Sequence, residues 1–190
     1  MSLRPLGIPG SYIVESSVFP DDRGFFREWF RGAELSDAGV DFAAAQANLS
    51  RSVSGVVRGL HYSIAPEGQA KVVTCVEGEL TDVIVDVRVG SPAFGTVVSV
   101  PLAAGNGTSV YLPAGVAHGF CVTSEVASLA YLLSSPYQAA YELGVDPFDA
   151  EVAVAWPLAG EPVVSARDAA APSLAERRAS GELPRFDEPR

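Results

Sequence analysis

The fold class of this chain is decided by the stretch Leu80-Thr81-Asp82-Val83-Ile84-Val85-Asp86-Val87-Arg88. It is rich in β-branched residues, which favour strands, and in it Asp82 and Asp86 alternate with valines. Successive side chains of a strand point to opposite faces, so this alternation predicts one wet face and one buried face. The turn residues Gly90-Ser91-Pro92 then close the segment. We therefore interpret it as a β-strand followed by a turn.

Similar short runs lie on both sides of this stretch and are separated by glycine and proline. The predicted strands are 72–76, 80–88, 96–102, 108–112, 119–123 and 128–134. Regular short strands with turn signals at this spacing favour a sandwich or barrel over a parallel α/β sheet. Helical patterns are confined to 32–38 and 173–180, where Ser173 and Glu176 have the spacing of a capping box.

Length and composition predict one domain over residues 1–190, with a loosely packed tail over 182–190. Apolar residues make up 48% of the chain, yet no apolar run approaches the ~20 residues that span a bilayer. The first residues lack a signal-peptide pattern, so we expect a cytoplasmic protein without a membrane partner. Cys75 and Cys121 lie in predicted strands, and we expect two reduced thiols in the core.

The formal net charge is −10, which argues against nucleic acid as a partner because phosphate backbones bind basic faces. A single phosphorylated small molecule is still compatible with this charge. Such a ligand needs only a few arginines that converge locally, while the rest of the surface stays acidic.

The chain contains only two histidines, and each lies in a short polar motif within apolar sequence. His61 follows Arg58 and precedes Lys71, while His118 lies in Gly115-Val116-Ala117-His118-Gly119. Histidine exchanges a proton near neutral pH, and the neighbouring cations suit an anionic ligand. The pattern therefore indicates a catalytic base beside an anionic substrate. The alternative is two hydrogen-bonded core histidines.

Several further blocks occur in a fixed order along the chain. They include Phe19-Pro20-Asp21-Asp22-Arg23-Gly24-Phe25-Phe26-Arg27-Glu28, Gln46-Ala47-Asn48-Leu49-Ser50, Gly55-Val56-Val57-Arg58-Gly59-Leu60-His61-Tyr62, Gly90-Ser91-Pro92-Ala93-Phe94-Gly95, Gly115-Val116-Ala117-His118-Gly119-Phe120, Ala155-Trp156-Pro157-Leu158 and Ser165-Ala166-Arg167-Asp168. Each block alone is a weak signal, but their order makes the combination specific.

In these blocks, from Phe19 to about Pro184, the chain resembles the dTDP-4-dehydrorhamnose 3,5-epimerases, a branch of the cupin jelly rolls. The resemblance implies an all-β, cupin-type jelly-roll sandwich or barrel with short peripheral helices. It implies epimerisation at C3, C5 or both of dTDP-4-keto-6-deoxy-D-glucose, in dTDP-L-rhamnose or related deoxysugar biosynthesis. A monoepimerase of an antibiotic-sugar pathway, acting at C3 only or C5 only, is the first alternative.

The resemblance also implies roles for individual residues. C3 and C5 both lie next to the C4 ketone, so their protons become acidic when the enolate is stabilised. His61 matches the family's base, Asp168 the carboxylate that orients it, and Tyr131 the acid on the opposite face of the sugar. No cofactor and no metal are implied.

The other implied roles concern substrate binding and assembly. Lys71 and His118 match contacts to the sugar, where an ammonium stabilises the enolate oxygen. Arg23 and Glu28 match residues of a strand exchanged with a second subunit, so a homodimer is implied. The remaining matches are phosphate or substrate contacts at Arg23, Arg58 and Arg167, other substrate contacts at Glu28, Gln46, Asn48 and Glu142, and thymine stacking at Tyr137.

The sequence departs from the family pattern at three places. Ser63-Ile64-Ala65 stands where many relatives have a glutamine after the His-Tyr pair, and Gln69-Ala70-Lys71 replaces a commoner pattern. We expect both stretches near the sugar pocket, where they bear on which carbon is inverted. Arg167 stands where lysine is common, which keeps the charge and changes the geometry.

Three other functions compete with this interpretation. A metal-dependent cupin oxygenase or isomerase needs about three histidines and a carboxylate around one metal, which two distant histidines cannot supply. A non-catalytic sugar-binding jelly roll is compatible with the composition, but it gives no reason to keep base, orienting acid and opposed tyrosine together. The cupin 3,4-ketoisomerases of nucleotide sugars share fold and substrate, but the motif at 58–62 with Tyr131 fits the epimerases better.

Overall fold

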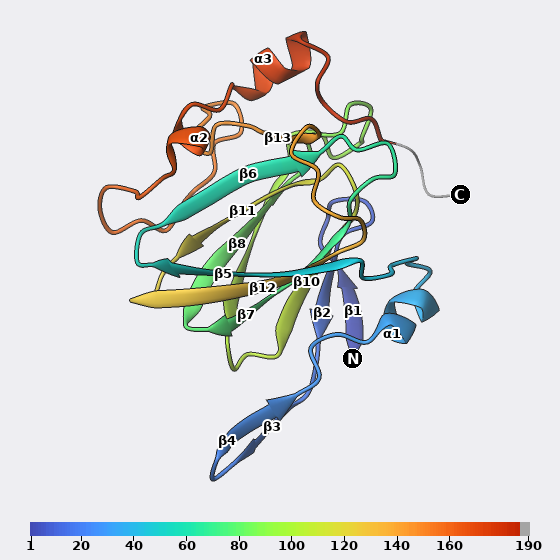
Figure 1. Ribbon diagram of the computed structural model, residues 1–190, viewed down its shortest axis with the longest axis vertical. Helices are drawn as coiled ribbons and strands as arrows, with labels where there is room; N and C mark the ends of the chain where they lie inside the picture. Colours follow the sequence, from blue (N-terminus) through green and yellow to red (C-terminus); the bar gives the residue numbers. More distant parts are fainter. Residues whose placement is uncertain (187–190) are drawn as a thin grey trace.

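Two antiparallel β-sheets packed face to face form the body of the molecule in the computed structural model, which describes residues 1–186 (Figure 1). The larger sheet has the order β1-β2-β10-β7-β12-β5, with bounds Ser2–Pro5, Tyr12–Glu15, Thr108–Leu112, Lys71–Glu77, Val126–Leu133 and Gln46–Val53. The smaller sheet has the order β13-β6-β11-β8-β9, with bounds Glu142–Gly144, Val57–Ser63, Ala117–Val122, Glu79–Val85 and Val97–Ala103. The predicted all-β jelly-roll class is confirmed.

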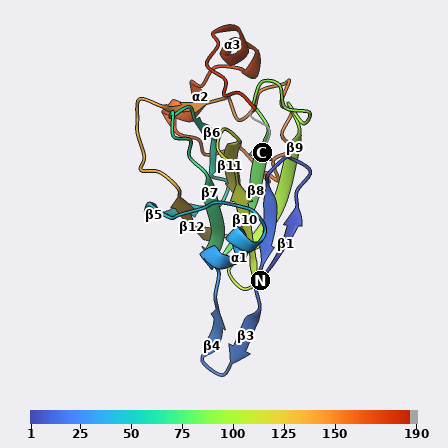
Figure 2. The same ribbon diagram turned by 90° about the vertical axis from the view of Figure 1, so that its right-hand side faces the viewer.

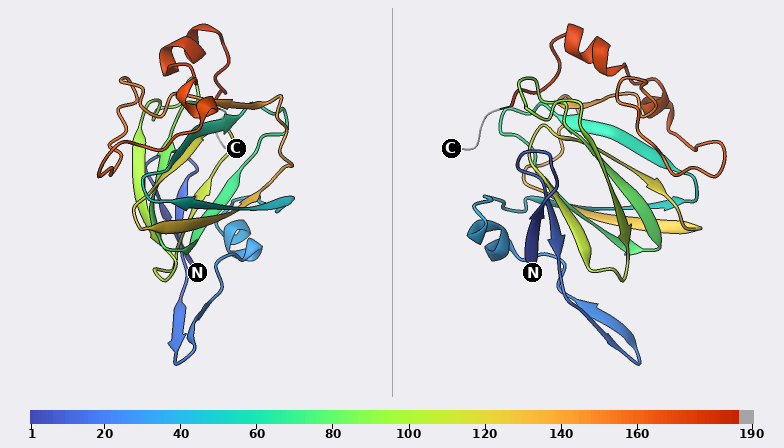
Figure 3. Two further views of the ribbon diagram at one scale, coloured as in Figure 1. Left: turned by 60° about the vertical axis from the view of Figure 1, so that its left-hand side comes forward. Right: turned by 180° about the vertical axis from the view of Figure 1, so that it is seen from behind.

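A separate hairpin projects from this body. Strands β3 (Val18–Asp21) and β4 (Gly24–Arg27) pair only with each other and extend away from the two sheets (Figures 1 and 2). In both views of Figure 3 this hairpin extends away from the two sheets, at the end of the molecule opposite the C-terminal helices. The strands predicted from composition and turn signals did not include this segment; only the resemblance, which placed Arg23 and Glu28 on an exchanged strand, implied a strand here.

Three short helices lie outside the sheets in the described part of the chain. They are α1 (Gly32–Asp37), α2 (Ala166–Ala169) and α3 (Leu174–Ala179). The capping box predicted at Ser173 and Glu176 is formed, with each side chain bonded to the other residue's backbone amide. Among residues 1–186 no helix has the length and apolarity that a bilayer crossing requires.

The core explains why the strand at 80–88 was only partly predicted. Leu80 and Ile84 of β8 pack between the two sheets, whereas Val83 and Val85 point outward into a second apolar cluster. That cluster includes Leu174 of α3 and other residues from the C-terminal third of the chain. Both faces of β8 are therefore covered, and the predicted wet face is wrong.

The two aspartates of this strand are consequently buried. Asp82 and Asp86 are both 0% exposed. Asp86 lies just beyond the end of β8 and binds Arg88 through two hydrogen bonds of 2.8 and 2.9 Å, while Ser91 donates a further one. Buried carboxylates require such partners, and Asp82 finds its own in the cavity described below.

The C-terminal segment packs more closely than its composition suggests. The sequence predicted a loose tail over 182–190, of which 187–190 lie outside the described residues. Leu183 is buried, the Val89 amide donates to the Pro184 carbonyl, and the Phe186 amide donates to the Val89 carbonyl. Residues 182–186 are thus fixed by pairing with the loop after β8, a partner that local composition cannot reveal. Cys75 and Cys121 are free and buried, as predicted.

Candidate active site

A cavity of about 180 Å³ opens between the two sheets and collects most of the residues singled out from the sequence. Its walls come from β5, β7 and β12 on one side and from β6 and β11 on the other, with Arg167 of α2 and residues around β13 at the rim. The lining residues are Asn48, Ser50, Arg58, His61, Gln69, Lys71, His118, Gly119, Phe120, Leu129, Tyr131, Leu133, Tyr137, Glu142 and Arg167.

His61 forms a tight pair with Asp168. Its Nε2 lies 2.7 Å from Asp168 Oδ1, and the second carboxylate oxygen accepts the Gly59 amide at 3.4 Å. Burial alone would raise the pKa of Asp168, but the hydrogen bond and charge of His61, together with the Gly59 amide and Ser165, hold it below its usual value. Asp168 is therefore a carboxylate at neutral pH, suited to orient an imidazole and to stabilise its protonated form.

Local sequence explains how these two distant residues meet. Ser165 caps the N-terminus of α2 by accepting the Asp168 amide, which fixes Asp168 in the first turn of the helix. Gly59 and Gly119 allow the backbones of β6 and β11 to touch, since a Cβ on Gly119 would lie 2.6 Å from the Arg58 carbonyl oxygen. Any larger residue at Gly119 would push β6, and His61 with it, away from β11.

His118 forms a second imidazole–carboxylate pair. Its Nε2 lies 2.6 Å from Asp82 Oδ1, and Asp82 is fully buried. Within residues 1–186, the other oxygen of Asp82, Oδ2, has no hydrogen-bond partner. The sequence analysis identified His118 but missed Asp82. The sequence did contain a clue: side chains two residues apart share one face of a strand, so Asp82 lies on the same face of β8 as Leu80 and Ile84, the face toward the larger sheet.

Tyr131 reaches the cavity from the opposite sheet. It lies on β12, between Asn48 of β5 and Val73 of β7 in the register, and packs partly against the core between the sheets. His61 lies on β6 of the smaller sheet. The base candidate and the acid candidate therefore face one cavity from its two walls.

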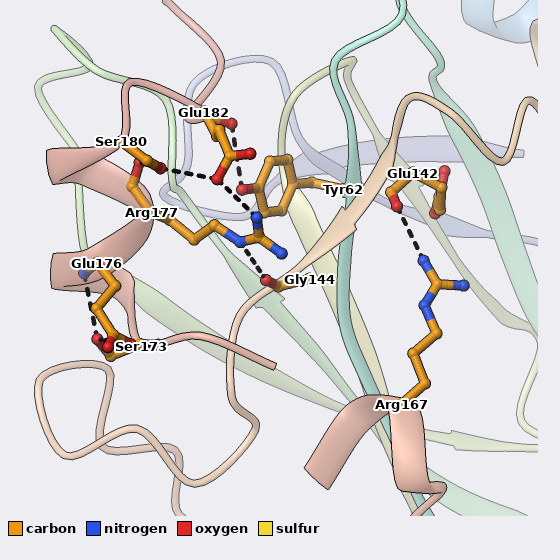
Figure 4. A network of polar contacts seen from close by, with 9 residues as sticks. All are labelled: Tyr62, Glu142, Gly144, Arg167, Ser173, Glu176, Arg177, Ser180 and Glu182. Carbon is orange, nitrogen blue, oxygen red and sulfur yellow. Dashed lines mark hydrogen bonds and ion pairs between the residues drawn. The ribbon is translucent and has the colours of Figure 1, made fainter. Parts of the chain in front are cut away.

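Lys71 lies at the start of β7 and is almost completely buried in this cavity. Its Nζ is 3.7 Å from Oε1 of Glu142, which is the first residue of β13. Burial lowers the pKa of Lys71, and the carboxylates of Glu142 and Asp82 partly offset this effect. Arg167 donates to the main-chain carbonyl of Glu142 at 2.9 Å (Figure 4). Glu142 thus binds Lys71 through its side chain and Arg167 through its main chain.

The remaining predicted contacts lie around the mouth of the cavity. Gln46 connects two of them, because its amide nitrogen donates to Asn48 and its oxygen accepts the Tyr137 amide. Arg58 is exposed and donates one hydrogen bond of 3.0 Å to Ser52. Tyr137 is 47% exposed. These side chains are thus free to contact a ligand that extends out of the cavity.

Arg23 and Glu28 do not join the cavity of their own chain. Arg23 lies in the turn between β3 and β4, where it pairs with Asp21 at 2.5 Å, and Glu28 follows β4 and pairs with Arg31. Neither lines the cavity, which agrees with their expected origin in a second subunit but does not test it.

The two departures that were expected near the sugar pocket, at 63–65 and 69–71, have different positions. Gln69 lines the cavity beside Lys71, as expected, and its amide nitrogen donates to the Ser135 carbonyl. Residues 63–65 instead line a separate hollow against 181–185, because the chain turns toward the C-terminal segment after β6. They do not line the cavity, but Ser63 lies opposite Glu142 of its rim in the β6–β13 pair, so this stretch is near the cavity without bordering it.

The donor set of the site suits proton transfer. Both imidazoles are engaged by carboxylates, and no cluster of three or more metal-ligating side chains occurs in the part of the chain that the structure describes. Two imidazole–carboxylate pairs, a lysine and an opposed tyrosine in a jelly-roll cavity define an acid–base enzyme of the cupin type.

Comparison with known proteins names the class more closely. The family model described as dTDP-4-dehydrorhamnose 3,5-epimerase matches residues 5–176. The chain belongs to this family and is an isomerase that epimerises a sugar, so the alternatives of a metal-dependent oxygenase and a non-catalytic sugar-binding protein are set aside.

Individual relatives are similar along nearly the whole chain. A dTDP-4-dehydrorhamnose 3-epimerase from Streptomyces niveus is 47% identical over 98% of this chain and 90% of its own. A dTDP-4-dehydrorhamnose 3,5-epimerase from Streptomyces griseus is 41% identical over 98% and 93%. Among solved structures, a 4-keto-6-deoxy sugar epimerase of the novobiocin gene cluster of Streptomyces spheroides has a TM-score of 0.94 and 47% identity over 98% and 94%.

Proposed function

We propose that this chain inverts C3, C5 or both of dTDP-4-keto-6-deoxy-D-glucose, as a step in the biosynthesis of dTDP-L-rhamnose or a related deoxysugar. The observation that carries the proposal is the placement of His61, with Asp168, and of Tyr131 on opposite walls of one cavity. Inversion requires a base on one face of the sugar ring and an acid on the other. Two opposed sheets supply that geometry.

The proposed reaction has two proton transfers. His61 removes the proton from C3 or C5, and the electron pair of the C–H bond moves through the new C=C bond to the C4 oxygen. Lys71 and His118 stabilise this enolate oxygen, since preorganised donors act strongly in a site shielded from water. Tyr131 then donates its proton to the opposite face of the carbon, and the C4 ketone forms again. The imidazolium returns its proton to solvent, and the tyrosinate takes one up.

The rim of the cavity supports a nucleoside diphosphate as the leading group. Arg58 and Arg167 offer forked guanidinium groups, which suit phosphate oxygens, and Tyr137 exposes a ring on which a thymine can stack. Gln46, Asn48 and Glu142 complete the contacts. The acidic surface elsewhere argues against nucleic acid, and the free cysteines fit a reducing, cytoplasmic setting.

We further propose that Arg23 and Glu28 act in the cavity of a second copy, as parts of an exchanged hairpin in a homodimer. Phe19 and Phe26 on this hairpin are 59% and 68% exposed, and such aromatic surface favours burial against a partner. Mixed dimers test this. A His61→Ala chain co-expressed with an Arg23→Ala chain should regain activity that neither homodimer has, because one of the two sites then has both residues. No recovery would contradict the exchange.

Incubation with dTDP-4-keto-6-deoxyglucose in D₂O, followed by NMR, tests the reaction itself. Exchange and inversion at both C3 and C5 would identify a 3,5-epimerase, whereas deuterium at one carbon alone would identify a monoepimerase. The second outcome is a real candidate because the similar enzymes include one named for C3 only. Activity should survive extended treatment with EDTA. Loss of activity that returns with a divalent cation would contradict the metal-free mechanism.

A further inference from the structure

A network of polar contacts outside the cavity joins α3 to the strands that carry the catalytic site (Figure 4). Arg177 of α3 donates from Nε to the Gly144 carbonyl at 2.9 Å, and its Nη1 lies 2.7 Å from Glu182 Oε2. The Arg177 side chain is only 14% exposed. It is thus a largely buried guanidinium with two defined partners and no part in the reaction proposed above.

Gly144 connects this arginine to the base. In the β6–β13 pair Gly144 lies directly opposite His61. A Cβ built on Gly144 would lie 3.5 Å from Cδ2 of the His61 ring and 3.2 Å from the Leu60 carbonyl oxygen. Gly144 is therefore a near neighbour of the imidazole, with room for about one methyl group between its Cα and the ring edge.

Strand β13 is a short edge strand, which Arg167 also binds through the Glu142 carbonyl. It is three residues long and lies at the edge of its sheet, where within residues 1–186 β6 is its only neighbouring strand. Its first residue, Glu142, is the partner of Lys71. A shift of β13 would disturb both the histidine and the lysine of the site.

The same network holds β6 from its outer face. Tyr62, next to His61, is buried, and its hydroxyl donates to the Glu182 carbonyl at 3.2 Å. The Glu182 carboxylate accepts from Arg177 and from Ser180. Glu182 therefore ties the strand that carries His61 to the arginine that binds β13.

We propose that Arg177, held by Glu182, is a positioning residue for catalysis: it fixes Gly144 of β13 against the imidazole of His61. The inference rests on the proposed role of His61 as the base. Asp168 orients the ring from one nitrogen, and β13, bound by Arg177, keeps Gly144 beside the Cδ2 edge of the ring. Removal of the guanidinium leaves the Gly144 carbonyl without its charged donor and gives the ring room to turn.

The test compares Arg177→Ala with the wild-type chain in the deuterium-exchange assay. We expect kcat to fall by about 10- to 100-fold, the scale of a misplacement near 1 Å at a reacting group. KM should stay within about twofold, because Arg177 does not line the substrate cavity. Arg177→Lys, which keeps a cation but lacks the fork, should recover part of kcat. A merely structural role would lower thermal stability without this split between kcat and KM.

Arg178→Ala is the matched control. Arg178 is the next residue on the same helix, and its guanidinium lies over the Phe94 ring at 5.3 Å, away from β13. The Arg178→Ala variant loses the same charge as Arg177→Ala and should leave kcat unchanged. Gly144→Ala provides a second test that keeps the arginine. Its methyl group would lie only 3.2 Å from the Leu60 carbonyl oxygen, so β13 must shift relative to β6 beside His61, and kcat should fall while Tyr62, Arg177 and Glu182 stay intact.

The outcomes separate this inference from the proposed function. If the wild-type chain shows no exchange, or if His61→Ala exchanges normally, the proposed reaction is wrong. If His61 is required but Arg177→Ala and Gly144→Ala both keep the wild-type kcat, the positioning role alone is wrong. If Arg177→Ala does not fold, Gly144→Ala and the milder Glu182→Gln decide, and full activity in both would overturn the inference.

Discussion

His61 lies directly opposite His118 in the antiparallel pair of β6 and β11, and each imidazole is hydrogen-bonded to its own aspartate. The two pairs nevertheless differ in accessibility. The His61 side chain is 30% exposed and that of His118 only 11%, while their carboxylate partners are almost completely buried. One wall of the cavity thus carries a more open imidazole, suited to take a proton, beside a more enclosed one, suited to hold an oxygen atom of the substrate.

The first prediction concerns the pair of His61 and Asp168. His61→Ala should abolish exchange of the C3 and C5 protons with solvent. Asp168→Asn should reduce exchange by about 10²- to 10⁴-fold, the usual contribution of a positioned acid or base, because an amide cannot stabilise the imidazolium. NMR in D₂O measures both variants. Exchange at the wild-type rate in His61→Ala would assign the base to another residue.

The second prediction concerns Asp82, the residue that the sequence analysis missed. Asp82→Asn should leave the fold intact, since the amide fills the same space, but it removes the charge that holds His118. A charge-assisted hydrogen bond of ~1.5 kcal/mol corresponds to about a tenfold effect, and we expect it mainly as a raised KM. A loss as large as that of Asp168→Asn, confined to kcat, would mean that His118 itself transfers a proton.

Much of the fold could be predicted from local sequence, and the errors have one cause. The strand at 108–112 has the predicted bounds, and the capping box at Ser173 forms, because both depend on neighbouring residues. The face of 80–88 that was expected to be wet carries Asp82 together with Leu80 and Ile84, and it packs toward the larger sheet, whose strands are far away in the sequence. Periodicity cannot report what a distant segment covers.

The same limit applies to the site. His61 stood out because histidines are rare here and because cations surround it, both of which are local observations. Its partner Asp168 comes from a four-residue helix that only the tertiary fold brings to β6, so spacing could not pair them. Resemblance supplied that pairing, and the 2.7 Å contact accords with it.

The third prediction concerns stability in acid and the buried pair of Asp86 and Arg88. Burial would raise the pKa of Asp86, but hydrogen bonds from Arg88 and Ser91 hold it below its ordinary value. The folded state therefore binds fewer protons than the unfolded state around this pKa, and stability rises with pH. The contribution is complete above the unfolded value near ~4 and is lost as the pH falls through the folded value.

Urea unfolding between pH 7 and pH 3 measures this effect. Asp86→Asn should be less stable than wild type at pH 7, and the difference should shrink in acid as the wild-type carboxylate becomes protonated. Arg88→Ala should cost about 3–5 kcal/mol at neutral pH, because it leaves a fully buried carboxylate without its cation. A wild-type stability curve parallel to that of Asp86→Asn would show that this pair does not set the acid limb.

The last prediction separates acid from base. Tyr131→Phe keeps the ring and its packing between β5 and β7 and removes only the hydroxyl, so folding should change little. His61 can still form the enolate, which is then quenched from the same face, and deuterium enters with retained configuration. Exchange should therefore persist at least in part, while net epimer formation falls by about 10²- to 10⁴-fold, as for loss of a general acid.

Tyr141→Phe is the control for this variant, because Tyr141 does not line the cavity and loses the same hydroxyl. It should retain both exchange and inversion. The informative quantity is the ratio of inverted to exchanged product, read from the couplings of H3 and H5 in one NMR time course. Inversion at the wild-type rate in Tyr131→Phe would mean that water or another group donates the proton on the side of the cavity formed by the larger sheet. A ratio that collapses only in this variant would assign the acid to Tyr131, opposite His61.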